Sequence, residues 1–312
     1  MKIIGAGLAG LLAGNILRKM QPVIIEKANS LPNNHTALLR HRENKIAEAT
    51  AIHFQKVKVQ KAICETVDGK QRITTTPNII HMNNYSMKVT GGYHNRSIGN
   101  LDPVERYIAP PDFIKLLSHG LDIRYGQDFK ITKTKSKCPI ISTMPMPVIA
   151  NMVGVKLNFD FEYREITVLS CDIAGVDIDL YQTVYFPSPT TKIYRASITG
   201  NRFIIEHIGS NIIPENVQWF KDDYLKDILQ YAFGISSNKI YFDNFSLKNN
   251  KYGKIKNVNS QERKDFIKYL TDKHNIYSLG RYATWRNILL DDVHNDVFVI
   301  KKLIESNGYI TR

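Results

Sequence analysis

The chain has 312 residues, of which 43% are hydrophobic and 23% are charged. These proportions are typical of a globular protein and exclude a disordered chain, a collagen-like repeat and a polytopic membrane protein. At roughly 150 residues per domain, the length predicts about two domains. The formal net charge of +13 favours anionic partners such as nucleic acid or phosphorylated substrates, unless the lysines are simply scattered over the surface.

Cysteine and histidine spacings give no sign of a metal centre. Cys64, Cys138 and Cys171 are widely spaced and form no CxxC pair, so we expect neither a disulfide framework nor a zinc site. The nine histidines show no paired-ligand spacing, and we predict no metal site. Unpaired cysteines fit a reducing compartment, which predicts a cytoplasmic protein.

The apolar stretch at residues 3–17 has two readings. It follows Lys2, as the apolar core of a signal peptide would, but Arg18 and Lys19 stand where the small residues of a cleavage site belong. No other run approaches the roughly 18 apolar residues of a membrane span. We therefore expect neither an export signal nor a membrane span.

The glycines inside this stretch form a nucleotide-binding pattern. An apolar strand at 2–4 runs into Gly5-Ala6-Gly7-Leu8-Ala9-Gly10, a helix is predicted over 8–20, and a second apolar strand at 22–25 ends in Glu26 and Lys27. Strand, GxGxxG, helix, strand and acid in this order are typical of a dinucleotide-binding unit.

Each residue type in this unit has a physical reason. Gly5 permits the tight turn, Gly7 lets the backbone approach a pyrophosphate, and Gly10 lets the helix pack closely on the strand. The N–H groups at the helix N-terminus are free to bind phosphate. Glu26 can accept hydrogen bonds from a ribose diol.

Further segments resemble one branch of the flavoproteins. Gly14 extends the motif to GxGxxGxxxG, a form closer to FAD-binding than to NAD-binding units. The segments 138–147, 185–206 and above all 275–286, with Gly280-Arg281 at a strand end, resemble the branch that contains amine oxidases, protoporphyrinogen oxidase and UDP-galactopyranose mutase. The resemblance implies FAD as the cofactor. It extends to compact relatives encoded by tailed phages, which implies the host cytoplasm as the location.

The resemblance also implies roles at the flavin end of the cofactor. Gly280 would let the backbone approach FAD and Arg281 would neutralise its pyrophosphate. The N–H groups of Asp292 and Val293, at a helix start near Asp291, would stabilise negative charge on the flavin. The spacing is about two residues longer than in relatives, which leaves the register at Asp291 open. Relatives carry an arginine after the acidic residue; Arg40 or Arg42 could take that place, unless both lie on an exposed helix.

The predicted cofactor-binding residues are therefore Gly5, Gly7, Leu8, Ala9, Gly10, Glu26, Lys27, Arg40, Phe129, Gly280, Arg281, Asp291, Asp292 and Val293.

The predicted fold class is α/β, with a Rossmann-like FAD-binding domain of the glutathione-reductase type and an inserted mixed-sheet substrate domain. The FAD domain is assembled from residues 1–50, 104–150 and 272–312, and the substrate region from residues 51–103 and 151–271. Period-two alternation predicts strands in the substrate region. Other predicted elements are helices at 111–119, 217–232 and 260–273, strands at 122–125 and 129–132, and an apolar strand from residue 138 that stops in a proline-rich loop before residues 148–153.

The substrate-facing residues are predicted to be Tyr185, Tyr194, Arg195, Tyr252 and Trp285. Arg195 could hold an anionic group through a bidentate contact, and Trp285 could cover the substrate or belong to the core. Residues 251–255 resemble a loop beside the active site of relatives, without its proline. The catalytic residues and the oligomeric state are not predicted.

Three functions remain open. The first is an FAD-dependent oxidoreductase that acts on an amine or another small-molecule donor. The second is a non-redox flavoenzyme of the UDP-sugar mutase type, with an anionic or nucleotide-linked substrate. The third is a catalytically inert flavoprotein that binds nucleic acid or protein, although the chain has no nucleic-acid-binding motif.

Overall fold

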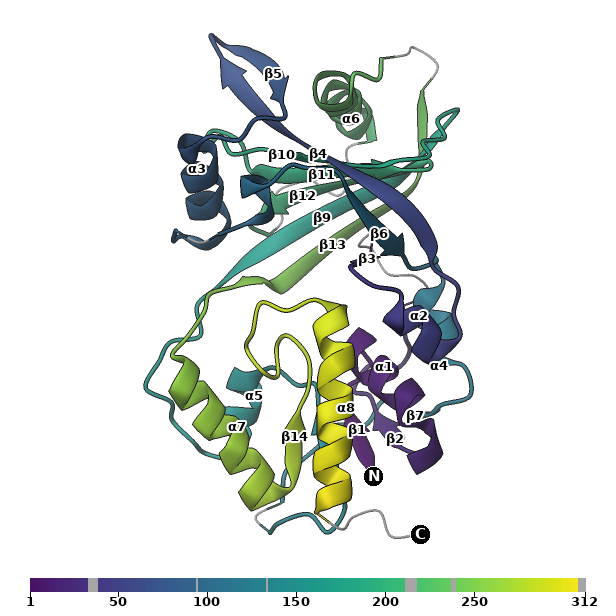
Figure 1. Cartoon of the computed structure of the whole chain (residues 1–312), viewed down its shortest axis with the longest axis vertical. Coiled ribbons are helices and arrows are strands. Elements are labelled where there is room, and N and C mark those ends of the chain that lie inside the picture. Colours follow the sequence, from purple (N-terminus) through teal and green to yellow (C-terminus); the bar gives the residue numbers. More distant parts are fainter. Residues whose placement is uncertain (33–38, 94, 133, 211–217, 237–239, 308–312) are drawn as a thin grey trace.

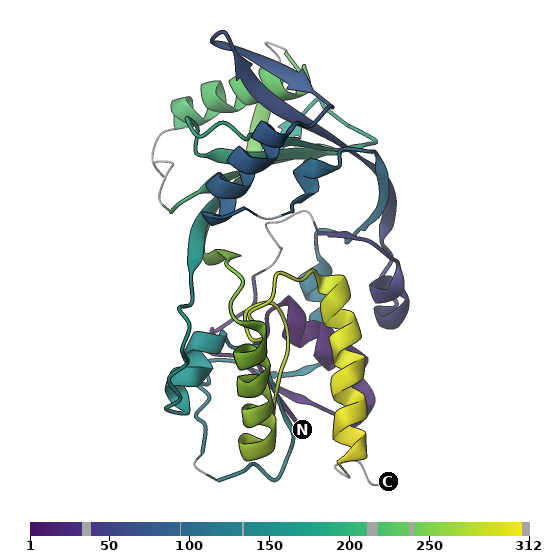
Figure 2. The ribbon, with the colours of Figure 1, turned by 60° about the vertical axis from the view of Figure 1, so that its left-hand side comes forward.

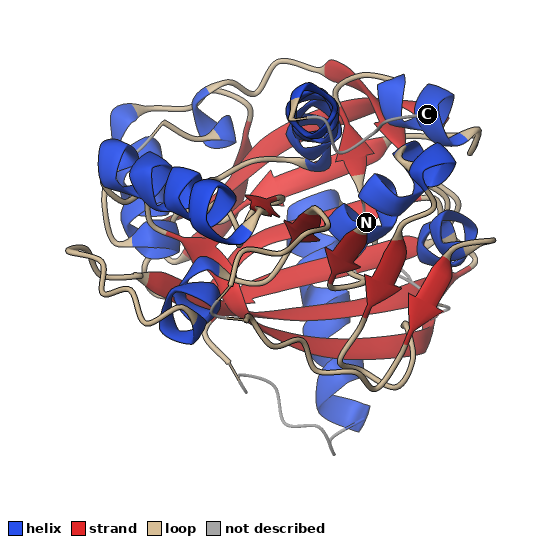
Figure 3. Ribbon diagram, turned by 90° about the horizontal axis from the view of Figure 1, so that it is seen from below, coloured by secondary structure: helices blue, strands red, loops and turns tan. Residues whose placement is uncertain are grey.

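The computed structural model describes the chain except residues 33–38, 94, 133, 211–217, 237–239 and 308–312, and it leaves out the side chains of 218–222. Two sheets lie at opposite ends of the long axis of the molecule, and long strands run from one half toward the other (Figure 1). Seen from below, the short strands of the first sheet lie in front of the long strands of the second (Figure 3).

The first sheet is parallel and has five short strands in the order β14-β8-β1-β2-β7. Its strands are β1 (Lys2–Ile4), β2 (Val23–Ile25), β7 (Asp122–Arg124), β8 (Ile140–Ser142) and β14 (Ile276–Ser278). Both faces of its central strands are buried, as is usual for parallel sheets that are covered by helices on both sides.

Alternate residues of these strands pack against different helices. Ile3 and Ile24 pack with α1 (Leu8–Ile16), α4 (Phe113–Ser118) and α8 (Leu290–Ser306). Ile4 and Ile276 pack with α5 (Met146–Met152) and α7 (Ser260–His274) on the other face. Figure 1 shows β14 between α7 and α8 in this half of the molecule, and Figure 2 shows the two helices from another side. The short α2 (Lys45–Thr50) packs against α1 and α8.

The second sheet has the strand order β13-β9-β12-β11-β10-β4-β6-β3, with β5 paired to β4. The strands are β3 (Arg40–His41), β4 (Gln55–Val67), β5 (Lys70–Thr74), β6 (Val104–Ile108), β9 (Tyr163–Ala174), β10 (Tyr181–Tyr185), β11 (Ile193–Thr199), β12 (Arg202–Ile208) and β13 (Tyr241–Ile255). The sheet is mixed, because β4 and β10 pair in parallel and their neighbours pair antiparallel. Helices α3 (Ile79–Thr90) and α6 (Gln218–Phe233) cover opposite faces.

The predicted fold class is confirmed, with differences in some elements. The first helix ends at Ile16 and continues only as a 3-10 turn over Arg18–Met20. The predicted strand at 129–132 does not form: this stretch is a loop, and Phe129 packs into the cluster beneath α5 and α7. The predicted helix at 217–232 corresponds to α6, and Val217 itself lies outside the described residues.

Three elements pack on a different sheet from the one expected from the predicted domain boundaries. Strands β3 and β6, predicted in the FAD domain, join the second sheet because β6 pairs with the first half of the long strand β4. Helix α7, most of which was predicted in the substrate region, packs instead on the first sheet through Phe266 and Leu270. None of the described helices is long and apolar enough to cross a membrane.

The β1–α1 turn depends on the absence of side chains. A Cβ atom at Gly10 would lie 1.9 Å from the carbonyl oxygen of Gly5, and one at Gly14 would lie 2.8 Å from Cδ1 of Ile24. Helix α1 therefore packs on the sheet at a distance that only glycine allows. By contrast, a Cβ atom at Gly7 would meet none of the described residues within 4 Å, and the backbone there is extended, with φ −70°.

This contrast predicts that an alanine substitution destabilises the protein at Gly10 but not at Gly7. Gly10→Ala should lower the free energy of unfolding of the ligand-free protein by about 1–3 kcal/mol, because the new methyl group overlaps backbone that must move. Gly7→Ala should leave it within about 0.5 kcal/mol. Urea denaturation of the ligand-free variants measures both values, and equal stability of the two variants would contradict the packing described here.

Candidate functional site

Glu26 closes the loop at the end of β2. Its Oε2 atom accepts a hydrogen bond from the N–H of Ala6 (2.6 Å), and its Oε1 atom accepts one from the N–H of Ala28 (2.8 Å). Gly5, with φ +93°, adopts a conformation that L side chains rarely take. The acid at the tip of β2 is thus fixed against the β1–α1 turn, on the same edge of the sheet as the start of α1.

The N-terminus of α1 is open at Gly7. The first helical hydrogen bond runs from the N–H of Leu11 to the carbonyl of Gly7, so the N–H groups of Leu8, Ala9 and Gly10 have no partner within the helix. No described residue lies within 4 Å of a Cβ atom built at Gly7, so these N–H groups are oriented as donors to an anion, as at other helix N-termini. Lys27 lies farther out and pairs with Asp128 at 3.7 Å, with both side chains exposed.

The loop after β14 meets this same turn. Gly280 has φ +91°, and a Cβ atom there would lie 2.9 Å from the Cβ of Ala9. Two segments that are 271 residues apart in the sequence are therefore in contact at the N-terminus of α1. Because of this contact and the positive φ, Gly280 is also structural: a side chain would strain the turn whatever the loop binds.

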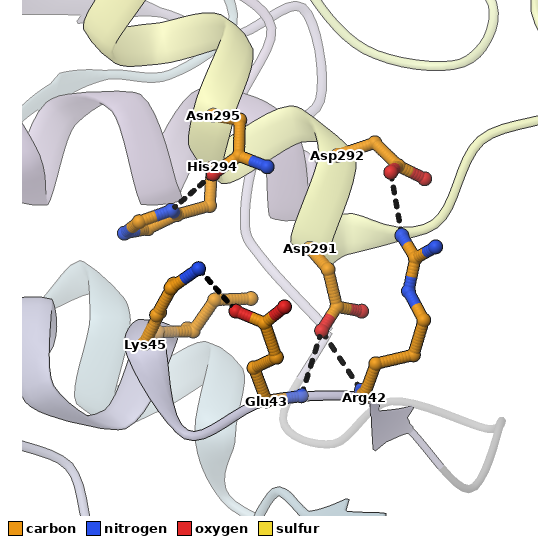
Figure 4. Close-up of a pocket in the computed structure, with 8 residues that line it drawn as sticks. Arg42, Glu43, Lys45, Asp291, Asp292, His294 and Asn295 are labelled. Atoms are coloured by element: carbon orange, nitrogen blue, oxygen red, sulfur yellow. Dashed lines mark hydrogen bonds and ion pairs between the residues drawn. The ribbon is translucent and has the colours of Figure 1, made fainter.

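The start of α8 faces the segment 41–43 (Figure 4). Asp291 accepts a hydrogen bond from the N–H of Arg42 (2.9 Å), and Asp292 forms an ion pair with the Arg42 guanidinium. Asp292 also accepts the N–H of Leu289 (2.9 Å) and so caps the helix. Of the two arginines proposed for a phosphate contact, Arg42 lies here beside α8.

The register at the start of α8 differs from the predicted one. The N–H groups of Asp292 and Val293 already donate to the carbonyl of Leu289, at 3.1 and 3.2 Å. They therefore have no hydrogen left for a ligand. The first-turn N–H groups outside these bonds are those of Leu290 and Asp291, which shifts the candidate contact toward the loop. The sequence had left the register at Asp291 open.

Arg40 points to the second sheet instead of the nucleotide unit. Its Nη1 atom donates to Thr183 Oγ1 (3.1 Å), and its guanidinium carbon lies 4.9 Å from the ring centroid of Tyr181. Both partners belong to β10. The contacts therefore make Arg40 a link between the segment after β2 and the second sheet.

Tyr194, Arg195 and Glu206 form one polar group on the second sheet. Glu206 accepts hydrogen bonds from the Tyr194 hydroxyl (2.6 Å) and from Nη2 of Arg195 (2.8 Å), and Nε of Arg195 pairs with its other oxygen. Neighbouring residues of a regular strand point to opposite faces. An irregularity between Ile193 and Arg195 in the pairing of β11 with β12 lets both side chains reach the same carboxylate.

The charges in this group shift its pKa values. Burial alone would raise the pKa of Glu206, but the charge and hydrogen bonds of Arg195 outweigh it and bring the pKa to about 2. Burial would lower the pKa of Arg195, and Glu206 instead raises it well above its usual value. Glu206 is therefore ionised at neutral pH and its charge is taken up by Arg195.

Three further cations surround this pair. Lys254 lies over the ring of Tyr194, with Nζ 4.4 Å from the centroid. Burial, and then the charges of Arg195, Arg281 and Arg96 working against that of Glu206, lower the pKa of Lys254 to about 7. We call Arg96, Arg195, Lys254 and Arg281 the basic cluster. Glu206 is the carboxylate whose negative charge acts on Arg195 and Lys254. One carboxylate does not balance the cluster, which therefore carries an excess of positive charge.

The basic cluster connects the two halves of the molecule. Arg281, from the loop after β14, donates through Nη2 to the carbonyl of Gly253 on β13 (3.3 Å). Burial lowers the pKa of Arg281 and also that of Arg96, which the charge of Arg281 lowers further. Within the described part of the chain, the buried Nε atoms of Arg96 and Arg281 have no hydrogen-bond partner. An anion would supply the missing acceptors.

The remaining predicted substrate residues are in packed surroundings. Tyr185 is 1% exposed, and its hydroxyl lies 2.9 Å from Ser97 Oγ. Trp285 is also 1% exposed and donates to the carbonyl of Lys256 (3.2 Å), between the rings of Phe161 and Tyr252. Trp285 was predicted either to cover the substrate or to belong to the core, and in the structure its side chain lies in the core. Tyr252 is half-buried, two residues before Lys254.

Sequence reasoning missed Arg96, Glu206 and Lys254 as members of the site. Glu206 and Lys254 lie in segments that carried the resemblance, so both could have been predicted as site residues from the sequence. Arg96 lies in a region without a motif, and only the tertiary fold brings it to Arg281. Among the residues that the structure describes, no group of three His, Cys, Asp or Glu side chains is placed to hold a metal ion.

Comparison with known proteins shows the fold. No family model and no curated protein matches the chain. A reduced UDP-galactopyranose mutase is 14% identical, with a TM-score of 0.69 over 100% of this chain and 96% of the mutase. A putative protoporphyrinogen oxidase from Exiguobacterium is 9% identical, with a TM-score of 0.63 over 98% of each chain.

An aklavinone-11 hydroxylase, solved with FAD and aklavinone, is 9% identical, with a TM-score of 0.51 over 95% of this chain and 60% of that one. The chain therefore has the two-domain fold of FAD-dependent flavoproteins along its whole length, including the branch that the sequence resembles.

Loss of the Glu206 carboxylate should destabilise the protein. Glu206→Gln leaves Arg195 in a partly buried site without its counter-charge, which should lower the free energy of unfolding by about 3 kcal/mol. Glu105→Gln is the matched control, because Glu105 pairs with Lys56 at 2.9 Å on the surface, where such a pair contributes under about 1 kcal/mol. Urea denaturation at pH 7 compares them, and equal losses would contradict the account.

The same substitution should change the pH dependence of stability. The pKa of Glu206 falls from 4.5 to about 2 on folding, so its contribution is fully present above pH 4.5 and is lost as the pH falls toward 2. The difference in unfolding free energy between the wild type and Glu206→Gln should shrink over that window. A difference that stays constant from pH 7 to pH 2 would show that Glu206 is not held ionised by Arg195.

Proposed function

We propose that the chain is an FAD-dependent oxidoreductase that acts on a small anionic substrate. The observation that carries this proposal is the contact of the Gly280 loop with the N-terminus of α1, because it joins the two segments that the resemblance assigns to opposite ends of one FAD molecule. The fold of the solved flavoproteins described above supports the cofactor assignment.

The residues of the first half fit FAD. The free N–H groups of Leu8 and Ala9 and the open space at Gly7 suit a pyrophosphate. Glu26, fixed at the tip of β2, suits a ribose diol. Arg42 and the N–H groups of Leu290 and Asp291 are candidates for the remaining polar groups of the cofactor. Phe129 and Lys27 remain candidates for the adenosine end, on the loop that follows β7 and on the end of β2.

Bound FAD would supply the chemistry by accepting an electron pair, and the protein's task is placement and electrostatics. The basic cluster would hold the substrate. The planar guanidinium groups of Arg96 and Arg281 can donate to an oxyanion through their Nε atoms, which have no partner among the residues that the structure describes. Lys254, with its pKa near neutrality, can accept or return a proton at Nζ. Arg195 is held in place by Glu206 and adds charge.

The charge of the cluster bears on the choice of substrate. A protonated amine would meet an excess of positive charge there, which disfavours the amine among the donors predicted from the sequence. An anionic substrate would remove that excess. The same observation favours the second candidate function, a non-redox flavoenzyme acting on a UDP-sugar, whose diphosphate would occupy the cluster.

The purified protein should contain FAD. Denaturation should release a cofactor with the mass of FAD, and not that of FMN or NAD. Gly7→Ala should weaken FAD binding by at least about tenfold, which is equivalent to about 1.4 kcal/mol. The reason is that the added methyl group occupies the space at the helix N-terminus. Flavin fluorescence titration of the cofactor-free protein measures the dissociation constants.

Because Gly7→Ala is expected to leave the ligand-free protein stable, a loss of affinity would not come from unfolding. Unchanged affinity would show that the pyrophosphate does not lie at Gly7. A folded protein that neither contains nor takes up FAD would overturn the proposal and leave a protein that binds nucleic acid or other proteins as the alternative.

Anion binding should depend on the protonation of Lys254. Sulfate keeps the same charge near neutral pH, so any pH dependence of its affinity comes from the protein. The affinity should fall as the pH rises through about 7, because Lys254 loses its positive charge there. Lys254→Met should remove that dependence. Lys256→Met is the matched control, because Lys256 lies two residues away and pairs with Glu162 at 2.7 Å. Calorimetric titration of the FAD-loaded variants measures the affinities, and a pH dependence that survives in Lys254→Met would contradict the assignment.

A further inference from the structure

Helix α3 and the loop after it carry an exposed group of large apolar side chains. Ile79 is 62% exposed, Ile80 63%, Met87 39% and Tyr93 69%. The opposite side of the same helix is buried in the second sheet through Tyr85 and Val89. Exposed apolar side chains that gather on one element mark a surface that contacts a ligand or a partner.

Part of this surface is hollowed into a groove. The groove is lined by Ile79, Met82 and Asn83 from α3 and by Tyr93, Asn95, Arg96 and Asn100 from the segment that follows it. Gly99 also lines it, and a Cβ atom there would lie 3.2 Å from the sulfur of Met82. The absence of a side chain at this position keeps the groove from being narrowed. Ile80 is as exposed as Ile79 but does not line the groove.

Arg96 links the groove to the basic cluster. It lines the groove, and burial and the charge of Arg281 lower the pKa of its guanidinium. Its buried Nε atom has no hydrogen-bond partner within the described residues. Helix α3 itself reaches the cluster, because the ring of Tyr85 lies 6.4 Å from the ring of Tyr194, whose centroid is 4.4 Å from Nζ of Lys254. The groove therefore offers the apolar side chains of Ile79, Met82 and Tyr93, with asparagines between and beyond them, and it has a positively charged end at Arg96.

We propose that the substrate is an amphipathic acid, whose anionic head binds the basic cluster and whose apolar chain lies along the α3 groove. This inference rests on the anion site of the proposed function and adds the chemical class of the rest of the substrate. Charge selects the head, since the excess positive charge lies at one end of the groove. Ile79, Met82 and Tyr93 offer the chain apolar contacts that would otherwise face water.

Alkyl sulfates of constant charge and different length test this inference. Methyl sulfate and octyl sulfate, below the concentration at which the latter forms micelles, are titrated into the FAD-loaded protein. Octyl sulfate should bind at least about tenfold more tightly, because several methylene groups leave water. Ile79→Ser should reduce that ratio by at least about threefold, the effect of removing one apolar side chain from contact. Ile80→Ser, the matched control, should leave the ratio unchanged.

Each outcome separates the inference from the function beneath it. If methyl sulfate binds and octyl sulfate binds no better, the apolar groove is not a substrate site, while the anion site stands. If Ile79→Ser keeps the ratio, or Ile80→Ser lowers it equally, the chain lies elsewhere and the inference is wrong. Tighter binding of uridine monophosphate than of octyl sulfate, lost in Ile79→Ser, would assign the groove to a nucleoside and also overturn it. If neither sulfate binds, the anion site and the inference fail together.

Discussion

Close backbone packing at the N-terminus of α1 is the constraint on which the rest of the structure depends. Gly10 lets the helix approach the turn at Gly5, and Gly280 lets the loop after β14 approach Ala9, in both cases to distances that a Cβ atom would not permit. The first approach fixes the helix N-terminus beside β1 and β2. The second brings the loop that carries Arg281 to the same point. Without both approaches, the basic cluster and the nucleotide unit would not share one region.

The second half of the site depends on an electrostatic balance. Glu206 neutralises Arg195, Arg96 and Arg281 keep their positive charge, and Lys254 keeps only part of its charge at neutral pH because its pKa is about 7. Holding such charges together in half-buried surroundings costs free energy, which the lowered pKa of Lys254 reflects. A structure tolerates this arrangement where a ligand supplies the opposite charge. The Nε atoms of Arg96 and Arg281, which have no hydrogen-bond partner among the described residues, indicate where that ligand would be held.

The sequence predicted the parts of the fold that local patterns determine. The glycines of the β1–α1 turn and Glu26 were identified from residue type and spacing, because turns and close approaches restrict which residues can be present, and the Gly280 loop was identified from its resemblance to a flavoprotein segment. The substrate side was harder to predict. Alternation in β11 places Tyr194 and Arg195 on opposite faces, and the irregularity that brings both to Glu206 depends on pairing with β12. Arg96 and Lys254 come together only through contacts between distant segments, which no local pattern encodes.

An experimental structure of the protein with FAD and methyl sulfate would test the central claim most directly, which is that one ligand site spans the junction of the two halves. The account predicts density for the pyrophosphate at the N–H groups of Leu8 and Ala9, with the flavin toward the Gly280 loop and sulfate in contact with Arg96, Lys254 or Arg281. FAD bound away from the Gly280 loop, or sulfate bound only outside the basic cluster in a protein with FAD in place, would contradict the account.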